Sequence, residues 1–228
     1  MKLYESLDLK ALTLVGFFII ILTSLKFSDG DFFWQIRTGQ YIYENGFLPS
    51  GDIFSYTKEG KFWVIQEWGY ELLVYVLYHL CDSLILIKAM LSLLVTIILY
   101  VSYTIVKRFT TTSNYPLIIS VLMWSYSAIG FSYRPHMFTY LFFILTLKIL
   151  LLYESSPQSK SIWWLPFIML TWVNMHAAFL IGIVLLFIFL VAEFIRLNHN
   201  KVFKKESPYF YKLVLCVFIS CLATLINP

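Results

Sequence analysis

Charged residues are scarce in this chain. Only 13% of its 228 residues are charged, whereas 60% are hydrophobic. A soluble domain carries about 25% charged residues and needs a polar surface to remain in water. The composition therefore excludes a soluble globule, and it also excludes a disordered chain, a collagen-like repeat and a nucleic-acid-binding domain. We expect an integral membrane protein.

Cysteine is scarce as well. The three cysteines, Cys81, Cys216 and Cys221, lie in or beside apolar runs. Their spacing matches neither a metal site nor a disulfide framework, so we interpret them as small buried apolar side chains. The sequence also lacks a P-loop and a glycine-rich dinucleotide fingerprint, which leaves no candidate nucleotide site.

Long apolar runs are what the sequence does have. A membrane-spanning helix needs about 20 mostly apolar residues. The stretch 161–192 holds no acidic or basic residue, but as one helix it would be about 48 Å long, and the hydrocarbon core is about 30 Å thick. We expect it to fold back near 174–176. The sequence thus predicts an all-α, polytopic transmembrane helical bundle with about seven spans, at 11–27, 83–106, 115–131, 135–153, 161–176, 178–197 and 210–226.

The basic residues indicate how these spans are oriented, because cytoplasmic loops carry an excess of Lys and Arg. With the N-terminus in the cytoplasm, loop 28–82 is external, and the chain is a multi-pass protein of the plasma (inner) membrane. Of the basic residues in the short loops between spans, Arg134 alone then lies outside. The cytoplasmic basic residues are Lys2, Lys10, Lys107, Arg108, Lys160, Arg196, Lys201, Lys204 and Lys205.

Domain organisation follows from this topology. We expect a single membrane domain over 1–228, in which the first span ends at residue 27, the external loop covers 28–82 and six further spans occupy 83–228. Residues 28–71 are acidic on an otherwise basic chain, since they hold seven acidic and three basic residues while the whole chain has a net charge of +4.

Two interfacial helices are expected in the external loop. The first covers 31–46, with aromatic residues suited to the membrane interface, Asp31 as its N-cap and Gly46 as its C-terminal stop. The second covers 64–80, where apolar residues recur at helical spacing after an acidic start. Treating this second segment as a span would place the basic loops outside, so an interfacial position is favoured.

The unusual polar residues of this membrane protein gather on one side. The acidic segment, Arg134 with His136, and Asn174 with His176 all fall at external ends of spans. Ionisable groups at membrane depth are energetically costly and by default indicate a functional site. We expect these residues to face one external cavity.

Short motifs on this external side occur in an order that resembles a known family. The motifs are Asp29-x-Asp31-x-x-Trp34-x-x-Arg37-x-Gly39, a Pro-x-x-Asp-x-Phe-Ser-Tyr stretch at 49–56, Trp63-x-x-x-Glu67-Trp68, Arg134-Pro135-His136, Trp172-x-Asn174-x-His176 and Asn227-Pro228. Over nearly the whole chain they resemble bacterial multi-spanning proteins related to glycosyltransferases of the GT-C superfold. That group includes the protein mannosyltransferase and lipid A aminoarabinose transferase types.

The resemblance implies a function and a set of site residues. It implies transfer of a hexosyl or pentosyl group, with inversion, from a polyprenyl-phosphate donor to a glycan, lipid or protein acceptor on the external face. It implies that Asp31 is the general base. Glu67 is the other catalytic candidate, as a second acid, a metal ligand or a partner for Arg37. A divalent metal ion is the cofactor to consider, with no ligands assigned. The substrate-binding residues implied are Asp29, Arg37, Asp52, Arg134, His136, Asn174 and His176.

Two positions and the length depart from the family pattern. Gln35 and Gln66 stand where many relatives have His, which weakens any role of an imidazole at these places. GT-C proteins usually have more spans than seven and often a C-terminal external domain. We therefore expect this chain to be the N-terminal portion of such an enzyme or a shortened product. Membrane lipids are its other expected partners.

Structural roles remain open for each candidate residue. Asp31 suits an N-cap, Glu67 suits a first helical turn, and Asp29 and Asp52 suit turns. The remaining alternatives are an ion pair of Arg37 with Glu44 or Asp31, contact of Arg134 with lipid headgroups, and helix-to-helix hydrogen bonds of His136, Asn174 and His176. We expect Glu193 and Arg196 to form a surface ion pair.

Two other functions also remain open. A transporter or flippase for a lipid-linked solute would place ionisable residues near the middle of the bilayer. The middles of these spans are nearly free of charge, which counts against an ion-coupled carrier. An inactive membrane fragment is the other alternative.

Overall fold

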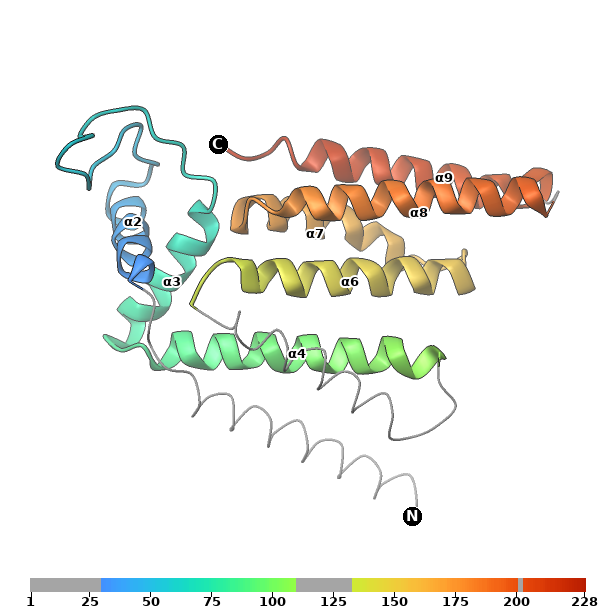
Figure 1. Ribbon diagram of the computed structural model, residues 1–228, viewed down its shortest axis with the longest axis horizontal. Helices are drawn as coiled ribbons and strands as arrows, with labels where there is room; N and C mark the ends of the chain where they lie inside the picture. Colours follow the sequence, from blue (N-terminus) through green and yellow to red (C-terminus); the bar gives the residue numbers. More distant parts are fainter. Residues whose placement is uncertain (1–29, 110–132, 201–202) are drawn as a thin grey trace, which may run out of the picture. The chain divides into compact units, whose positions relative to one another are not determined.

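The structure, a computed structural model, describes residues 30–109, 133–200 and 203–228. Over these ranges the chain forms seven α-helices and one short 3₁₀ helix, with no β-strand (Figure 1). This confirms the all-helical class. The spans expected at 11–27 and 115–131 and the candidate residue Asp29 lie outside the described residues.

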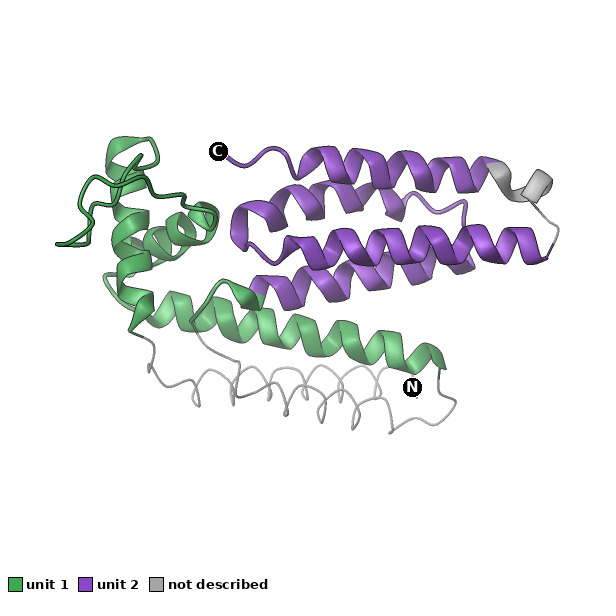
Figure 2. Cartoon of the chain, turned by 45° about the horizontal axis from the view of Figure 1, so that its top comes forward, with its two compact units in different colours: residues 1–137 green, residues 138–228 purple. Residues whose placement is uncertain are grey.

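The chain divides into two compact units, residues 1–137 and 138–228 (Figure 2). The first unit contains α2 (Asp31–Asn45), α3 (Trp68–Cys81) and α4 (Ile85–Phe109). The second contains most of α6 (His136–Ser155), the 3₁₀ helix η2 (Ser161–Trp164), α7 (Leu165–Met175), α8 (Phe179–His199) and α9 (Phe203–Ala223). The single membrane domain expected over 1–228 stays a prediction.

Helix α2 forms where the sequence predicts the first interfacial helix. Its buried residues recur at helical spacing and include Phe32, Ile36 and Ile42. It ends at Gly46, whose φ of 76° is a left-handed conformation that suits glycine, and the Gly46 N–H donates to the Ile42 carbonyl. The start differs from the prediction. Gly30 is the N-cap and Asp31 is the first helical residue, so Asp31 does not occupy the N-cap position.

Helix α3 begins later than expected, at Trp68 rather than residue 64. The reason is the preceding hairpin, because Phe62 pairs with Gly51 in an isolated antiparallel bridge. The Asp52 N–H also donates to the Lys61 carbonyl over 2.8 Å. The hairpin thus closes at residue 62, and residues 63–67 connect it to α3. At its other end α3 stops at Asp82, a non-glycine residue with φ of 46°.

Gly39 allows α2 and α3 to pack closely. A methyl group at Gly39 would lie 2.0 Å from the Glu71 carbonyl oxygen and 2.7 Å from Cβ of Tyr75. Real Cβ atoms do not approach other atoms so closely, so only glycine fits here without a shift of α3. One turn later, Tyr43 lies against Tyr75 and His79, with ring centroids 5.5 Å and 5.6 Å apart.

Within the described residues, three helices are long and apolar enough to cross a membrane: α4, α6 and α8. Two further apolar helices, 161–175 and 208–223, are shorter. Only 17% of the most apolar stretch of α8 is buried within the protein. Side chains such as Ile181, Val184 and Ile188 are exposed along it, as expected of a helix whose surroundings are lipid rather than water. The full set of seven spans stays a prediction.

The long uncharged stretch 161–192 does fold back, as predicted. Helix α7 ends at Met175, His176 is extended with φ of −161°, and α8 begins at Phe179. Helices α7 and α8 then pack closely, since a methyl group at Gly182 would lie 2.5 Å from Cζ3 of Trp172. The break therefore produces two helices rather than one long helix.

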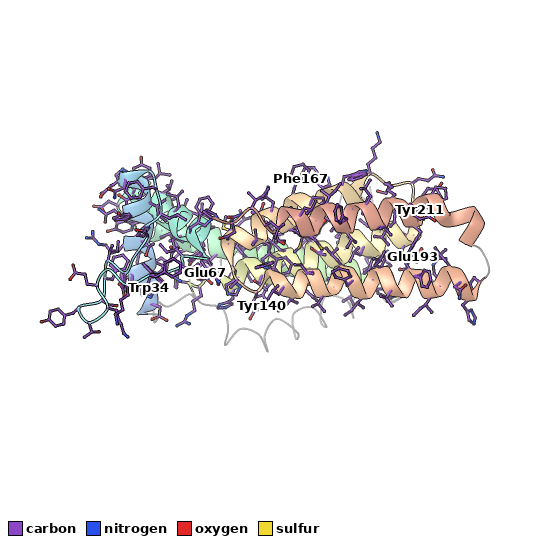
Figure 3. All side chains as sticks on the ribbon, turned by 90° about the horizontal axis from the view of Figure 1, so that it is seen from above. Trp34, Glu67, Tyr140, Phe167, Glu193 and Tyr211 are labelled. Atoms are coloured by element: carbon purple, nitrogen blue, oxygen red, sulfur yellow. The ribbon has the colours of Figure 1, made fainter. Side chains whose placement is uncertain are left out.

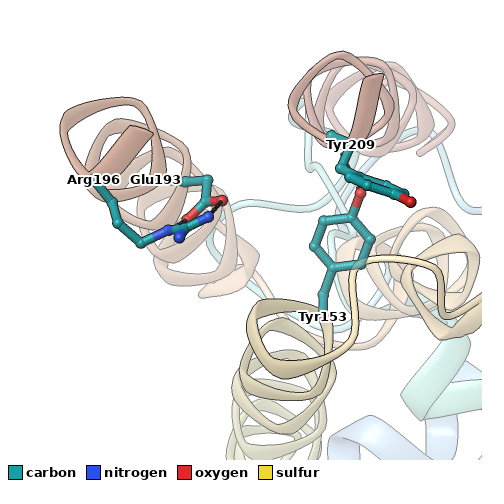
Figure 4. A network of polar contacts seen from close by, with 4 residues as sticks. All are labelled: Tyr153, Glu193, Arg196 and Tyr209. Carbon is teal, nitrogen blue, oxygen red and sulfur yellow. Dashed lines mark hydrogen bonds and ion pairs between the residues drawn. The ribbon is translucent and has the colours of Figure 1, made fainter. Parts of the chain in front are cut away.

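Near the opposite end of the second unit from His176, a hydrogen bond joins α6 to α9 and an ion pair forms within α8. The Tyr153 hydroxyl on α6 donates to the Tyr209 carbonyl on α9 over 2.8 Å (Figure 4). Arg196 donates to both carboxylate oxygens of Glu193 within α8, at 2.7 and 2.8 Å, which confirms the predicted ion pair. Among the cysteines, Cys216 is buried as expected, but Cys81 is exposed because it ends α3 beside the turn to α4.

Candidate functional site

Asp31 and Arg134, two residues singled out by the sequence, form an ion pair. Nη2 of Arg134 lies 2.7 Å from Oδ2 of Asp31, across 103 positions of sequence. The Arg134 side chain is 47% exposed and the Asp31 side chain 58% exposed. A ligand arriving from solvent can therefore reach both charged groups.

Aromatic contacts hold Arg134 in place beside α2. Its neighbour Tyr133 is buried and packs against Phe32 of α2, with ring centroids 5.5 Å apart. The Tyr70 hydroxyl of α3 donates to the Tyr133 carbonyl over 2.6 Å. The segment before α6 is thus fixed to both α2 and α3, which leaves Arg134 facing the first turn of α2.

The Asp31–Arg134 pair combines two chemical abilities. The Asp31 carboxylate accepts protons or hydrogen bonds, and it stands in the first helical turn of α2, where the helix dipole favours negative charge. The Arg134 guanidinium carries five N–H donors in a planar fork, so it can bind a phosphate while still lying near the carboxylate.

Asp52 has a structural role in the hairpin between α2 and α3. Its Oδ1 accepts the backbone N–H groups of Phe54 and Ser55, both at 2.9 Å. The Ser55 side chain and these two N–H groups lower the pKa of Asp52. This is the turn-forming alternative that the sequence left open, and the predicted substrate contact is untested.

Arg37 lies on the exposed side of α2 in a chain of polar contacts. It donates to Gln40 Oε1, and Gln40 Nε2 donates to Glu44 Oε1 over 2.7 Å. Arg37 thus reaches Glu44 through Gln40 rather than as a direct ion pair. The carboxylate of Asp31, its other proposed partner, binds Arg134 instead.

Glu67, the second predicted acid, occupies the N-cap position of α3 without a capping side-chain hydrogen bond. Its charge acts on Glu71, one helical turn away, and contributes to raising the pKa of that carboxyl. Glu67 and Trp34, both labelled in Figure 3, belong to the first unit. The Trp34 ring lies 5.9 Å from that of Trp63, which in turn lies 5.8 Å from Phe54.

In the second unit, His176 is part of a small network at the end of α7. Thr139 Oγ1 accepts from Trp172 Nε1 over 3.0 Å and lies 2.7 Å from His176 Nδ1. The Thr139 hydroxyl can either donate to a neutral imidazole or accept from a protonated one. The network therefore joins α6 to α7, and it was not predicted because Thr139 lies within an apolar run.

Asn174 and Asn227 fasten the C-terminal segment to α7 by reciprocal hydrogen bonds. Asn174 Nδ2 donates to the Ile226 carbonyl over 2.9 Å and to the Leu170 carbonyl over 2.7 Å. Asn227 Nδ2 donates to the Val173 carbonyl over 2.8 Å. Asn174 therefore bonds within α7 and to the segment that follows α9, which is a structural role but not the helix-to-helix bond that the sequence left open.

The structure assigns no metal site within its described residues, where no three His, Cys, Asp or Glu side chains gather as ligands would. A divalent metal cofactor stays a prediction. His136 begins α6 two residues after Arg134. The predicted residues thus fall into two groups, with Asp31 and Arg134 paired in the first unit and Asn174 and His176 in the second.

No protein-family model, no curated protein and no solved structure matches this chain.

Proposed function

We propose that this protein is a membrane glycosyltransferase of the GT-C type. It transfers a sugar from a polyprenyl-phosphate donor to an acceptor on the external face of the plasma membrane. The observation that carries the proposal is the ion pair between Asp31 and Arg134. Separate motifs mark these two residues, and the fold brings their side chains into contact.

In this proposal Asp31 is the general base. Its carboxylate takes the proton from an acceptor hydroxyl or amine while that group attacks the anomeric carbon of the sugar. The bond from the anomeric carbon to the phosphate oxygen breaks, and polyprenyl phosphate leaves with the bonding electrons. A single displacement of this kind inverts the configuration at the anomeric carbon.

Arg134 binds the donor phosphate and stabilises the charge that grows on it. Without donor, its guanidinium is neutralised by Asp31. Phosphate oxygens compete with the carboxylate for the same N–H groups, so donor binding frees Asp31 for the acceptor.

The place of Arg134 along the chain supports a lipid-linked donor. Arg134 lies two residues before α6, which is long and apolar enough to cross a membrane. A guanidinium just outside such a helix stands at the depth of lipid phosphates.

The test is turnover by the purified full chain in lipid nanodiscs with a synthetic polyprenyl-phosphate sugar and extracted membrane lipids and glycans as acceptors. We expect Asp31→Asn to lower kcat about 100-fold or more, since general bases contribute at least that much. Arg134→Lys should mainly raise KM for the donor. Asp82→Asn is the matched control, because Asn tolerates the left-handed conformation of Asp82.

Two results would contradict the proposal. Full activity of Asp31→Asn would remove Asp31 as the base. In sealed proteoliposomes, movement of intact donor across the bilayer without cleavage of the sugar–phosphate bond would favour a flippase.

A further inference from the structure

Glu71 is an acidic residue buried in the first unit. It lies on α3, is 1% exposed, and its Oε2 has no hydrogen-bond partner among the described residues. A buried carboxylate without a partner is costly. Such a carboxyl is expected to hold a proton or to share one.

Gln35 on α2 presents a second buried oxygen of the same kind. It is 4% exposed, and its Oε1 has no partner among the described residues. Gln35 precedes Gly39 by one helical turn and therefore lies on the same face of α2. That face packs against α3, where Gly39 meets Glu71 and Tyr75.

Residues further along α2 contact residues further along α3, and this places Gln35 near Glu71. Gly39 meets Glu71 and Tyr75, and Tyr43, one turn later, meets Tyr75 and His79. One turn earlier on α2, Gln35 therefore faces the beginning of α3. The Glu71 side chain leans the same way, because helical side chains point toward the N-terminus of their helix.

We propose that Glu71 is a neutral carboxylic acid whose O–H donates a hydrogen bond to Gln35 Oε1 and thereby fastens α3 to α2. One proton then satisfies both unpartnered oxygens, since a protonated carboxyl is a donor and the amide oxygen is an acceptor. The inference does not depend on the proposed transferase activity. Asp31 lies one turn before Gln35 on α2, so this bond also holds the helix that carries Asp31.

The surroundings of Glu71 favour the neutral acid. Burial, followed by repulsion from Glu67, raises the pKa of Glu71 to about 8. The nearby cations have other partners, as Arg134 binds Asp31 and Arg37 binds Gln40. The elements around Glu71 carry many titratable groups. They are Glu67, Tyr70, Tyr75, Tyr78, His79, Cys81 and Asp82 on or beside α3, Asp31, Arg37, Tyr41, Tyr43 and Glu44 on α2, Lys88, Tyr100, Tyr103, Lys107 and Arg108 on α4, and Tyr133, Arg134 and His136.

The proton on Glu71 makes stability depend on pH in a defined direction. Between pH 4.5, the ordinary pKa of the group, and pH about 8, the folded protein keeps the proton while the unfolded chain has lost it. The contribution of Glu71 to stability is therefore greatest below pH 4.5 and falls as pH rises toward 8. Above that pH the carboxyl ionises in the folded state and the hydrogen bond is lost.

The first experiment is thermal unfolding of the full chain in nanodiscs from pH 4.5 to 8. We expect Tm of the wild type to fall across this window. Glu71→Gln, whose amide N–H can replace the acid O–H, should show a smaller fall, and Glu59→Gln, at an exposed position of the same loop, should behave as the wild type. Equal pH profiles for wild type and Glu71→Gln would overturn the inference.

The second experiment observes the proton directly and does not need Glu71→Gln to fold. Infrared spectra at pH 6 should show a protonated carboxyl band in the wild type. In Gln35→Leu the band should move to higher frequency, because the O–H loses its acceptor. Absence of the band in the wild type would overturn the inference, since the Gln35 amide N–H would then be donating to an ionised Glu71. An unshifted band in Gln35→Leu would also overturn it.

Discussion

At the scale of single residues, the Asp31–Arg134 pair is more important for chemistry than for stability. Both side chains are about half exposed, and exposed ion pairs contribute about 0–1 kcal/mol to folding. Because the pair contributes so little to the free energy of folding, each group can exchange its partner at little cost. This is the property that a phosphate-binding arginine beside a general base requires.

The first prediction concerns the strength of this pair. In a double-mutant cycle with Asp31→Asn and Arg134→Gln, the coupling energy should be at most about 1 kcal/mol. It should shrink at high salt, because exposed charges are screened. Thermal or denaturant unfolding in detergent micelles at low and high salt measures it. A coupling of several kcal/mol that resists salt would show a structural pair instead.

Asp52 is the second residue whose role the structure clarifies. Its carboxylate organises the hairpin by accepting two backbone N–H groups. Because the folded state lowers the pKa of Asp52 below its ordinary 3.8, the turn is strongest above that pH. Its stabilisation is lost as pH falls through the lowered value.

The second prediction is that Asp52→Ala loosens the hairpin 51–62. Proteolysis within these residues at neutral pH should be faster than in the wild type. Glu59→Ala, in the same hairpin, should leave the cleavage rate unchanged. Equal cleavage of Asp52→Ala and wild type would mean that the Gly51–Phe62 bridge alone holds the loop.

At the scale of elements, the close crossing of α2 and α3 depends on the missing side chain of Gly39. The first obstacles to a methyl group are backbone atoms of Glu71, which cannot move unless α3 moves. Gly182 differs, because its nearest neighbours are the side chains of Trp172 and Met169. The α7–α8 contact can therefore adjust more easily.

The third prediction follows from this crossing. Gly39→Ala should lower the free energy of unfolding by about 3 kcal/mol, since overpacking against backbone is costly. Gly30→Ala is the matched control, because Gly30 has φ of −65° and nothing within 4 Å of a new Cβ. Its cost should be at most about 1 kcal/mol, since Gly30 is the N-cap, where Ala is less favoured than Gly. Equal effects of the two substitutions would contradict the close approach.

Element boundaries show what local patterns can predict. The left-handed stop at Gly46 and the break at residues 176–178 follow from nearby residues, and both were predictable. The start of α3 was placed four residues too early, because the bridge between Gly51 and Phe62 joins residues eleven positions apart. Glu71 is one of the seven acidic residues of 28–71, and its spacing from Val74 and Tyr75 places it on the buried face of α3.

At the scale of the whole molecule, the helices α4, α6 and α8 are long and apolar enough to cross a membrane. Their direction across it depends on the distribution of Lys and Arg. The predicted topology places residues 28–82 outside, and α3 with its terminal Cys81 belongs to this loop. Cys81 is exposed, whereas Cys216 is buried, so the native cysteines provide a test of sidedness.

The fourth prediction is that a membrane-impermeant thiol reagent labels Cys81 in right-side-out vesicles. The comparison is made in a Cys221→Ser background, because Cys221 is partly exposed as well. There, labelling should be lost on adding Cys81→Ser and unchanged on adding Cys216→Ser. In inside-out vesicles, Cys81 should react only after permeabilisation. The reverse pattern would invert the topology and place the Asp31–Arg134 pair on the cytoplasmic side.

The sequence by itself determined the helical class, the apolar character of α4, α6 and α8, and the break between α7 and α8. These are properties of short windows, because hydropathy and helical spacing are set by neighbouring residues. Only the tertiary structure decided that Asp31 binds Arg134, that Asn174 and Asn227 exchange hydrogen bonds, and that Glu71 is buried beside Gly39. Each of these depends on which side chains meet when segments far apart in the chain pack together, and no local pattern contains that information.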